Sequence, residues 1–347
     1  MRTALSFLSF AAAAAMSLFD LLAGAHAQDA TEQFYTGRQV RLYTSVGAAS
    51  GYSVWAHLLA NYLGRHIPGS PSIVVDSMVG AGGLRAANYM YSVAPKTGQE
   101  MLAANGLLPM SWITGAQGVA FDASQFNWLG SPTNETNICV VTKASGIRNV
   151  DDLFDKPVIM GTDGVGSGMH IFPTVLNSIL ATKFKIIDGY KDTGEVILAM
   201  NRNEIQGICE SIATLTQRGG AEIKSGDWRV VLQGGSERDP AFPDVPLILD
   251  YAKTEAQKQA LQFFYAGLSF GRPYVLPPGV PAERVAVLRK ALQDTAADAD
   301  FLADAKQQHL DVDLITGAQM DDMIAQLKST PKDIVAKVST LLGGGEK

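Results

Sequence analysis

The stretch Val40-Arg41-Leu42-Tyr43-Thr44, followed by Gly47-Ala48-Ala49-Ser50-Gly51, has the pattern of a short strand that ends in a loop of small residues. Apolar residues then recur at helical spacing from Val54 to Leu63. Ser53 is the expected N-cap of this helix, because its hydroxyl can accept from the free N–H groups of the first turn. Gly64 is a natural stop. The segment therefore predicts a strand–loop–helix unit.

The same unit returns in the middle of the chain. The strand Val158-Ile159-Met160 leads into the glycine-rich segment 161–168, and a helix is expected over residues 169–181. No sequence repeat accompanies this repeated architecture. Strands that alternate with helices predict mostly parallel sheets with helices on both faces. The expected fold class is therefore α/β.

Composition excludes several classes of protein. The chain has 347 residues, of which 47% are hydrophobic, so it can bury enough apolar surface to fold and is long enough for two domains. Its formal net charge is −6, and it has no run of lysines or arginines, which argues against nucleic acid as a partner. Two cysteines are too few for a disulfide scaffold or a cysteine-based zinc site.

The N-terminus, residues 1–27, has the features of a signal peptide. Arg2 is the short positive start, residues 5–25 are mostly apolar or small, and Ala25-His26-Ala27 is a typical cleavage site. The alternative is a membrane anchor, but Asp20 interrupts the apolar run and leaves it too short to span a bilayer. We expect export and cleavage.

Catalytic motifs are mostly absent. Gly164-Val165-Gly166-Ser167-Gly168-Met169 nearly fits a dinucleotide fingerprint, but Met169 stands where the third glycine belongs. Ser167 lacks the G-x-S-x-G spacing of a hydrolase elbow, and the histidines lack metal-binding spacing. We expect no cofactor, no metal and no enzymatic activity. An exported hydrolase that uses His170 beside Ser167 is the competing interpretation.

Two glycine-rich loops remain, at residues 47–51 and 164–168, and each leads into a helix. A helix N-terminus presents free N–H groups and the positive end of the helix dipole, so it can hold an anion without a basic side chain. The alternative is that both loops are only tight turns. Their equivalent places in two α/β units favour a shared ligand cleft.

Several motifs, taken together, resemble one known family. They begin with Gly80-Ala81-Gly82-Gly83 and Ala94-Pro95-Lys96-Thr97-Gly98, which resemble the G-A-G-G and A-P-x-D/T-G signatures of the tripartite tricarboxylate transporter receptors, the Bug-type periplasmic binding proteins. The other motifs agree in order over residues 38 to about 328: Val40-Arg41-Leu42 before Gly51-Tyr52, Gly189-Tyr190-Lys191, Phe242-Pro243-Asp244-Val245-Pro246 and Pro277-Pro278-Gly279-Val280-Pro281.

Two departures from the family pattern change the expected site. Members often have Asp after Gly-Tyr in the first loop, where this chain has Ser53, which carries no charge. The glycine of the family's Y-K-G segment is Asp192 here, which adds a negative charge beside the expected cleft.

The resemblance implies a type II periplasmic-binding-protein fold, with two α/β lobes joined by crossing strands and a ligand cleft between them. We expect the first lobe to comprise residues 28–137 and 236–347, and the second residues 138–235. The implied function is capture of a small carboxylate-bearing molecule in the periplasm and its delivery to the membrane permease subunits of a transporter, by a monomeric receptor. A receptor that signals to a membrane sensor is an alternative.

The expected ligand-binding residues come from both lobes. Ser50, Gly51 and Tyr52 belong to the first loop, and Gly166, Ser167 and Gly168 face them from the second. Tyr190, Lys191 and Thr193 are expected at the far end of the ligand, with Asn105 and Asn137 at the ends of cleft strands. Both tyrosines have an alternative role in packing.

The two cysteines fall in strands that can be neighbours in this fold. Cys139 lies in the strand expected to enter the second lobe, and Cys209 in a strand near its end. A disulfide would persist after export to an oxidising compartment. The alternative is a pair of buried free thiols that pack as small apolar residues.

Overall fold

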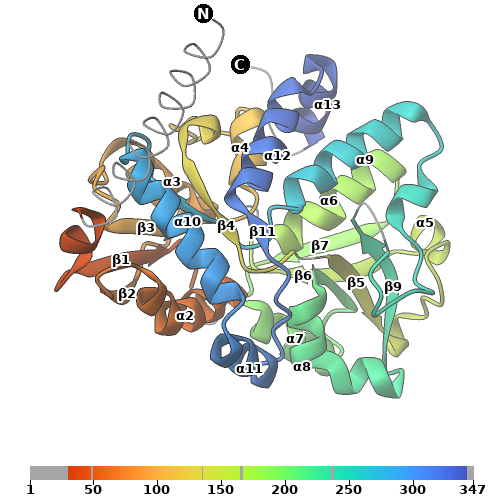
Figure 1. The fold of residues 1–347 in the computed structure, drawn as a ribbon. Helices are drawn as coiled ribbons and strands as arrows, with labels where there is room; N and C mark the ends of the chain where they lie inside the picture. The colour runs from red at the N-terminus through yellow and green to blue at the C-terminus, as the bar shows by residue number, and fades with distance from the viewer. Residues whose placement is uncertain (1–29, 48–49, 135, 165–166, 236–237, 342–347) are drawn as a thin grey trace, which may run out of the picture.

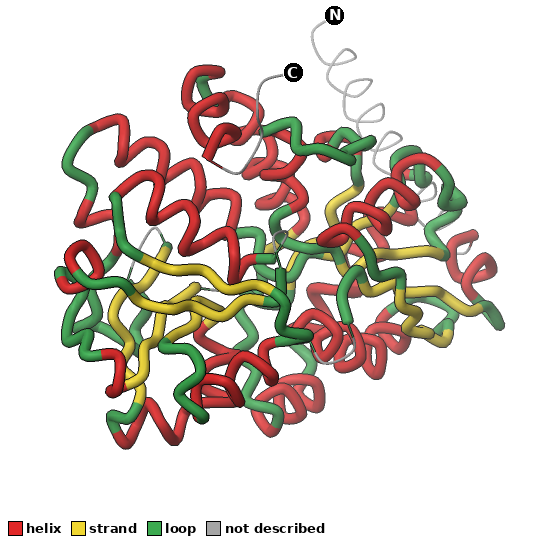
Figure 2. Tube along the Cα trace, turned by 180° about the vertical axis from the view of Figure 1, so that it is seen from behind, coloured by secondary structure: helices red, strands yellow, loops and turns green. Residues whose placement is uncertain are grey.

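The computed structural model describes residues 30–47, 50–134, 136–164, 167–235 and 238–341. The predicted signal peptide, residues 1–27, lies outside the described residues. Two sheets lie side by side, each with helices packed on it (Figure 1). The view from behind shows helices on the outside of both sheets (Figure 2). Among the described residues, no helix combines the length and apolar composition that crossing a bilayer requires.

The first sheet has the strand order β11-β4-β10-β3-β1-β2. Strands β1 and β2 pair in parallel, as do β1 and β3, whereas β10 runs antiparallel to both β3 and β4. We call this sheet and the helices packed on it lobe 1. Its strands are β1 Gln39–Thr44, β2 Ser72–Ser77, β3 Glu100–Ala103, β4 Asn127–Ser131, β10 Tyr274–Leu276 and β11 Ile315–Thr316.

The second sheet has the strand order β7-β6-β8-β5-β9 and forms lobe 2 with its helices. Strand β6 is parallel to β7 and β8, and β5 is antiparallel to β8 and β9. The strands are β5 Asn137–Thr142, β6 Val158–Thr162, β7 Phe184–Asp188, β8 Gly207–Ser211 and β9 Trp228–Gly234.

Both sheets are mixed, so the expectation of mostly parallel sheets was wrong. The chain leaves the first sheet at β4 and enters the second at β5, which is the next element in chain order. Parallel neighbours need a crossover connection, usually a helix, whereas strands that enter or leave a lobe directly are free to run antiparallel. Alternation of strands and helices along the sequence does not reveal these crossing strands.

The helices follow most of the predicted periodic segments. The bounds are α2 Gly51–Leu63, α3 Leu84–Ser92, α4 Leu108–Ile113, α5 Asp152–Asp155, α6 Gly168–Leu180, α7 Thr193–Asn201, α8 Ile212–Ser225, α9 Glu255–Leu268, α10 Ala282–Ala296, α11 Ala299–Gln307, α12 Gly317–Ser329 and α13 Lys332–Leu341. The predicted N-cap of α2 was wrong: Ser50 caps the helix and accepts a hydrogen bond from the N–H of Ser53 at 3.2 Å. Ser53 is buried inside the first turn.

Helix α9 joins the two lobes. It belongs to the part of the chain expected in lobe 1, yet it lies alongside α6 of lobe 2 (Figure 1). Gln257 of α9 donates a hydrogen bond to the carbonyl of Ile179 at 2.7 Å, and the Phe172 ring of α6 packs against the rings of Phe264 and Tyr265. The predicted division of the chain into two lobes stays a prediction. Helix α9 was assigned to lobe 1 in that division, but it contacts α6 of lobe 2.

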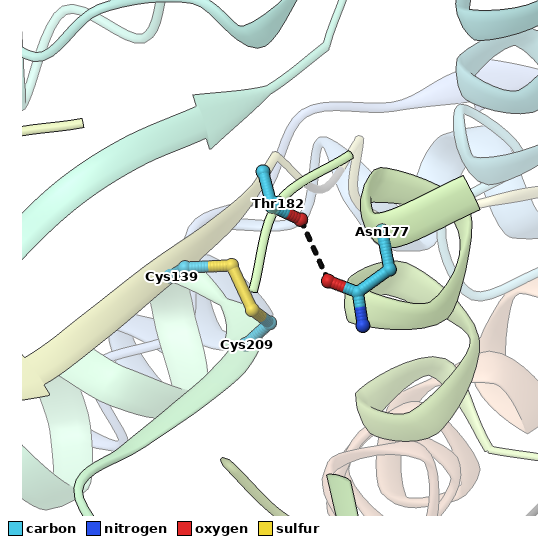
Figure 3. Close-up of a disulfide and its surroundings, with 4 residues drawn as sticks. All are labelled: Cys139, Asn177, Thr182 and Cys209. Carbon is cyan, nitrogen blue, oxygen red and sulfur yellow. Dashed lines mark hydrogen bonds between the residues drawn. A yellow bond between two sulfur atoms is a disulfide. The ribbon is translucent and has the colours of Figure 1, made fainter. Parts of the chain in front are cut away.

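Cys139 and Cys209 form a disulfide (Figure 3). They are directly opposite each other on the antiparallel strands β5 and β8, and their Cα atoms are 4.0 Å apart. Both residues are buried in the core of lobe 2, close to the hydrogen bond between Thr182 and Asn177. The structure therefore confirms the disulfide and contradicts the alternative of two free thiols.

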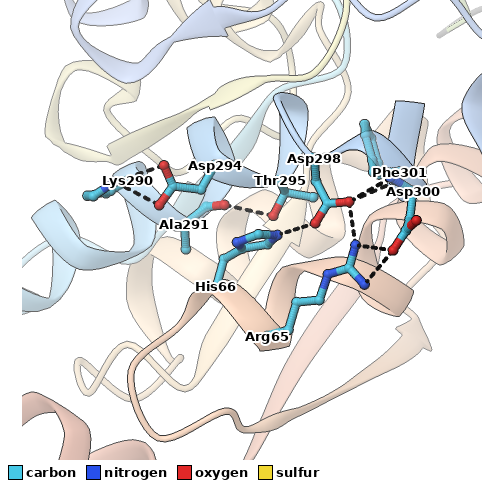
Figure 4. A network of polar contacts seen from close by, with 9 residues as sticks. All are labelled: Arg65, His66, Lys290, Ala291, Asp294, Thr295, Asp298, Asp300 and Phe301. Carbon is cyan, nitrogen blue, oxygen red and sulfur yellow. Dashed lines mark hydrogen bonds and ion pairs between the residues drawn. The ribbon is translucent and has the colours of Figure 1, made fainter. Parts of the chain in front are cut away.

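A network of hydrogen bonds and ion pairs connects Arg65 and His66, which directly follow α2, to the N-terminus of α11 (Figure 4). Asp298 caps α11 through the N–H groups of Asp300 and Phe301, and its other oxygen lies 2.8 Å from Nε2 of His66. Arg65 pairs with Asp298 and, at 3.3 Å, with Asp300. The hydrogen bond from Arg65 is the main reason that the pKa of Asp298 lies well below its usual range.

We expect Asp298→Asn to destabilise the protein at pH 7, although Asn can still cap the helix. The lowered pKa means that the charge stabilises the fold above about pH 4, the ordinary range of an Asp carboxyl, and that this stability is lost as the pH falls further. The difference in Tm between wild type and variant should therefore shrink below about pH 4. Thermal denaturation at several pH values measures it, with the exposed Asp300→Asn as a control of small effect. A difference that stays constant with pH would contradict the role of the charge.

Candidate ligand-binding site

A cavity of about 460 Å³ lies between the two lobes. It is placed where β1 leads into α2 and where β6 leads into α6, so both glycine-rich loops border it. In α/β sheets this position, beyond the carboxyl ends of parallel strands, is where ligands commonly bind. The geometry therefore brings together the two loops that the sequence analysis paired.

Most of the predicted site residues line this cavity. They are Ser50, Gly51, Tyr52, Asn105, Asn137, Ser167, Gly168, Lys191 and Thr193. Gly166 lies outside the described residues. Tyr190 is not among the lining residues; its ring lies beside Gly161 and packs against the core of lobe 2, which is the alternative role considered for it.

The N-terminus of α2 forms part of the lobe 1 wall. Ser50 uses its hydroxyl to accept from Ser53, while Gly51 and Tyr52, the first two residues of the helix, line the cavity. The first N–H groups of a helix have no partner within the helix and carry its positive dipole end. This wall can therefore hold an anion.

The N-terminus of α6 repeats the arrangement in lobe 2. Ser167 caps the helix by accepting from the N–H of His170 at 3.3 Å, and Gly168 and Met169 line the cavity. Two helix N-termini, one from each lobe, thus border one space. Their dipoles add, which favours a ligand that carries negative charge.

Two of the predicted residues hold the cavity wall through their polar groups. Asn105 donates to the carbonyl of Gly82 at 2.9 Å and accepts from the N–H of Leu107 at 3.0 Å, so it ties the Gly80–Gly83 loop to the cavity. The Tyr52 hydroxyl accepts from the N–H of Gly106 at 3.1 Å. Both side chains therefore stabilise the backbone of the cavity wall, whether or not they also contact a ligand.

The sequence analysis missed several charged residues of the site. Arg272 is 4% exposed and lines the cavity, and Asp163 and Glu210 line it from lobe 2. The sequence offered one signal for Arg272, namely a single arginine next to the apolar strand Tyr274–Leu276. A charged side chain is buried only where its surroundings compensate the charge, so an arginine in such a segment is a candidate site residue. Burial raises the pKa of Asp163, and the nearby charges of Asp188 and Asp192 raise it further, whereas a hydrogen bond with Ser167 lowers it.

His170 has the partner that a catalytic base would need. Its Nδ1 lies 2.7 Å from an oxygen of Asp188, which also accepts a hydrogen bond from Thr162. However, Ser167 contacts the backbone N–H of His170, and His170 is not among the residues that line the cavity. Within the described part of the chain, the Ser167 hydroxyl and the His170 ring therefore lack the nucleophile–base contact that the competing hydrolase requires.

Among the described residues, no three His, Cys, Asp or Glu side chains are grouped in a way that could hold a metal ion. His66 and His170 each contact a single carboxylate residue. Hydrogen-bond donors and charged side chains are among the residues that line the cavity.

Comparisons with known proteins agree with this architecture. No protein-family model matches the chain. It is similar to a UPF0065 protein of Bordetella bronchiseptica, with 22% identity over 274 residues, which cover 78% of this chain and 76% of that protein.

Solved structures share the fold. MatC from Rhodopseudomonas palustris, with bound malate, aligns with a TM-score of 0.64 and 17% identity over 86% of this chain and 99% of that one. The periplasmic binding protein BugD aligns with a TM-score of 0.61 and 18% identity over 89% and 98% of the two chains. The predicted fold of two α/β lobes is confirmed. BugD, which shares this fold, is a periplasmic binding protein, and the sequence motifs resemble those of Bug-type periplasmic binding proteins.

Proposed function

We propose that this protein is a periplasmic receptor that captures a small carboxylate-bearing molecule and delivers it to the membrane permease of a tripartite tricarboxylate-type transporter. The observation that carries the proposal is the pair of helix N-termini, from α2 and α6, on opposite sides of one cavity. Malate bound to MatC, which has the same fold, supports a carboxylate as the ligand. The expected signal peptide and the likeness to BugD support the periplasm.

Binding in this receptor requires no reaction step. The N–H groups of Gly51 and Gly168 and the hydroxyls of Ser50 and Thr193 are suited to bind and orient the oxygens of a carboxylate. Because these groups come from two lobes, a ligand that contacts both stabilises their approach and excludes water from the cavity. The receptor would act as a monomer and release its ligand to the permease subunits.

Calorimetry against a panel of small carboxylates, malate among them, should give one bound ligand per chain. Mass spectrometry of molecules released from the purified protein would name the natural ligand. A ligand at a hundred times its Kd should stabilise the fold by about 2.7 kcal/mol. Turnover of the bound compound would contradict a receptor without enzymatic activity.

A matched pair of variants tests whether this cavity is the binding site. A Cβ on Gly168 would meet no atom within 4 Å, and the same holds for Gly220 of α8, which does not line the cavity. Gly168→Tyr should therefore fold but lose binding by tenfold or more, whereas Gly220→Tyr should bind as the wild type does. Equal affinities of the two variants would place the ligand elsewhere.

A further inference from the structure

The two lobes also meet away from α9, where α8 of lobe 2 contacts α11 of lobe 1. In Figure 1 these two helices lie at the lower edge of the molecule, whereas α9 lies at the upper edge. The side-chain amide of Gln217, in α8, donates a hydrogen bond to the backbone carbonyl of Gln308 at 2.8 Å. Gln308 is the C-cap of α11, and α11 packs on α2 of lobe 1. One side chain of lobe 2 is thus bonded to the backbone of lobe 1.

The way in which α11 ends makes its last carbonyl a suitable acceptor. His309 has a φ of +57°, the left-handed conformation that commonly follows a helix. The N–H groups of His309 and Leu310 donate to carbonyls of the last turn at 3.1 and 2.9 Å. The carbonyls of a helix C-terminus that remain need partners from outside the helix and carry its negative dipole end. Gln217 therefore completes the capping of α11 across the two lobes.

A small cavity lies between this contact and the ligand cavity. Its volume is about 10 Å³, room for about one water molecule. Gly51 and Thr193 line it and the ligand cavity, and Gln217 and Leu310 also line it. Leu310 is 7% exposed. The lobes are therefore closely packed here, and α8 and α11 must separate for the ligand cavity to open on this side.

Other connections between the lobes do not break when the cavity opens. The chain itself joins the sheets, because β5 follows β4 and β10 follows β9 in strand order along the chain. The contact between α8 and α11 is non-covalent and is lost on opening. Contacts that exist only in the closed form prolong it, and they act mainly on the rate of dissociation.

We propose that Gln217 holds the two lobes together around a bound molecule and thereby slows its release. Gln217 is not among the residues that line the ligand cavity, so it acts through α11 as a positioning residue. The inference rests on the proposed function and adds to it a residue outside the ligand cavity that controls affinity. The hydrogen-bond donor of Gln217, and not the bulk of its side chain, is the group that matters.

Three variants at position 217 separate the donor from the size of the side chain. Gln217→Met keeps the length but has no donor, and it should release malate, succinate or adipate about fivefold faster than the wild type does. Gln217→Glu places a negative charge against the negative end of α11 and should release about tenfold faster. Gln217→Lys again offers a donor to the carbonyl and should release as the wild type does. Stopped-flow tryptophan fluorescence measures release, because Trp55 lines the small cavity.

Association rates and Tm should stay at the wild-type values in these variants, because position 217 is exposed and lies outside the ligand cavity. Ala221→Glu is the control, since it adds the same charge at an exposed position later in α8. It should release the probes as the wild type does. Unchanged release by Gln217→Met, or failure of Gln217→Lys to restore slow release, would overturn the proposal and leave the proposed function intact.

Small-angle X-ray scattering without any added carboxylate tests the contact by itself. Gln217→Glu should have a larger radius of gyration than the wild type, and Ala221→Glu should not. Equal radii for all three proteins would overturn the proposal, whether or not a carboxylate binds. If the wild type binds none of the carboxylate probes, the proposed function is rejected, and the scattering result then decides alone whether Gln217 holds the lobes together.

Discussion

Removal of the Cys139–Cys209 bridge should lower the free energy of unfolding by about 4 kcal/mol. The bridge joins residues 70 positions apart in the sequence, so it shortens a long loop of the unfolded chain. In the chain-entropy model the loss of that constraint favours the unfolded state. The folded state changes little, because β5 and β8 are already paired by backbone hydrogen bonds around both cysteines.

Urea unfolding of the wild-type chain with and without reductant measures this effect without a change of sequence. Both cysteines are buried, so reduction needs an unfolding step, after which the reduced chain is refolded and compared. The double variant Cys139→Ala/Cys209→Ala should give a similar loss, since it also removes the bridge. Equal unfolding midpoints for oxidised and reduced protein would show that the bridge does not stabilise the fold.

Elements whose signals are local could be predicted from the sequence. The helix expected over residues 169–181, which is α6 Gly168–Leu180, and the stop at Gly64 agree with the structure because periodicity and helix ends depend on a few neighbouring residues. The cap of α2 was placed at Ser53 instead of Ser50, three residues away, because both serines precede apolar residues and either can cap. Local sequence cannot choose between two such caps.

Elements that depend on tertiary contacts could not be predicted. Strand β10 has three residues and β11 has two, too few for a recognisable alternation, and both exist because β4 lies beside them. Their antiparallel pairing makes the first sheet mixed. These strands return from the C-terminal part of the chain to a sheet begun near residue 40.

The same division applies to the site. The glycine-rich loops were found because a small-residue segment between a strand and a helix has local meaning. Arg272 reaches the cavity from a segment more than 200 residues after Gly51, and no local pattern relates the two. Tyr190 was chosen from a motif resemblance, and the structure places its ring against the core of lobe 2.

Gly271→Ala should cost about 2–5 kcal/mol of stability, through two separate effects. Gly271 has a φ of +59°, a conformation that costs an alanine about 1–2 kcal/mol. A Cβ there would also lie 2.0 Å from the carbonyl oxygen of Thr133, in the segment that crosses between the lobes. Relief of such overlap in a packed region costs about 1–3 kcal/mol more, because backbone must move.

Gly37→Ala is the matched control, because Gly37 has a similar φ of +68° but a Cβ there would meet no atom within 4 Å. It should therefore cost only the conformational part, about 1–2 kcal/mol. Thermal and urea unfolding of both variants would measure the difference, which reports the overlap with Thr133 alone. Since Gly271 precedes Arg272 and both line the cavity, its variant should also bind ligand more weakly than the Gly37 variant. Equal stability losses in the two variants would mean that the crossing segment yields to a Cβ at no cost, and that it does not fix the position of Arg272.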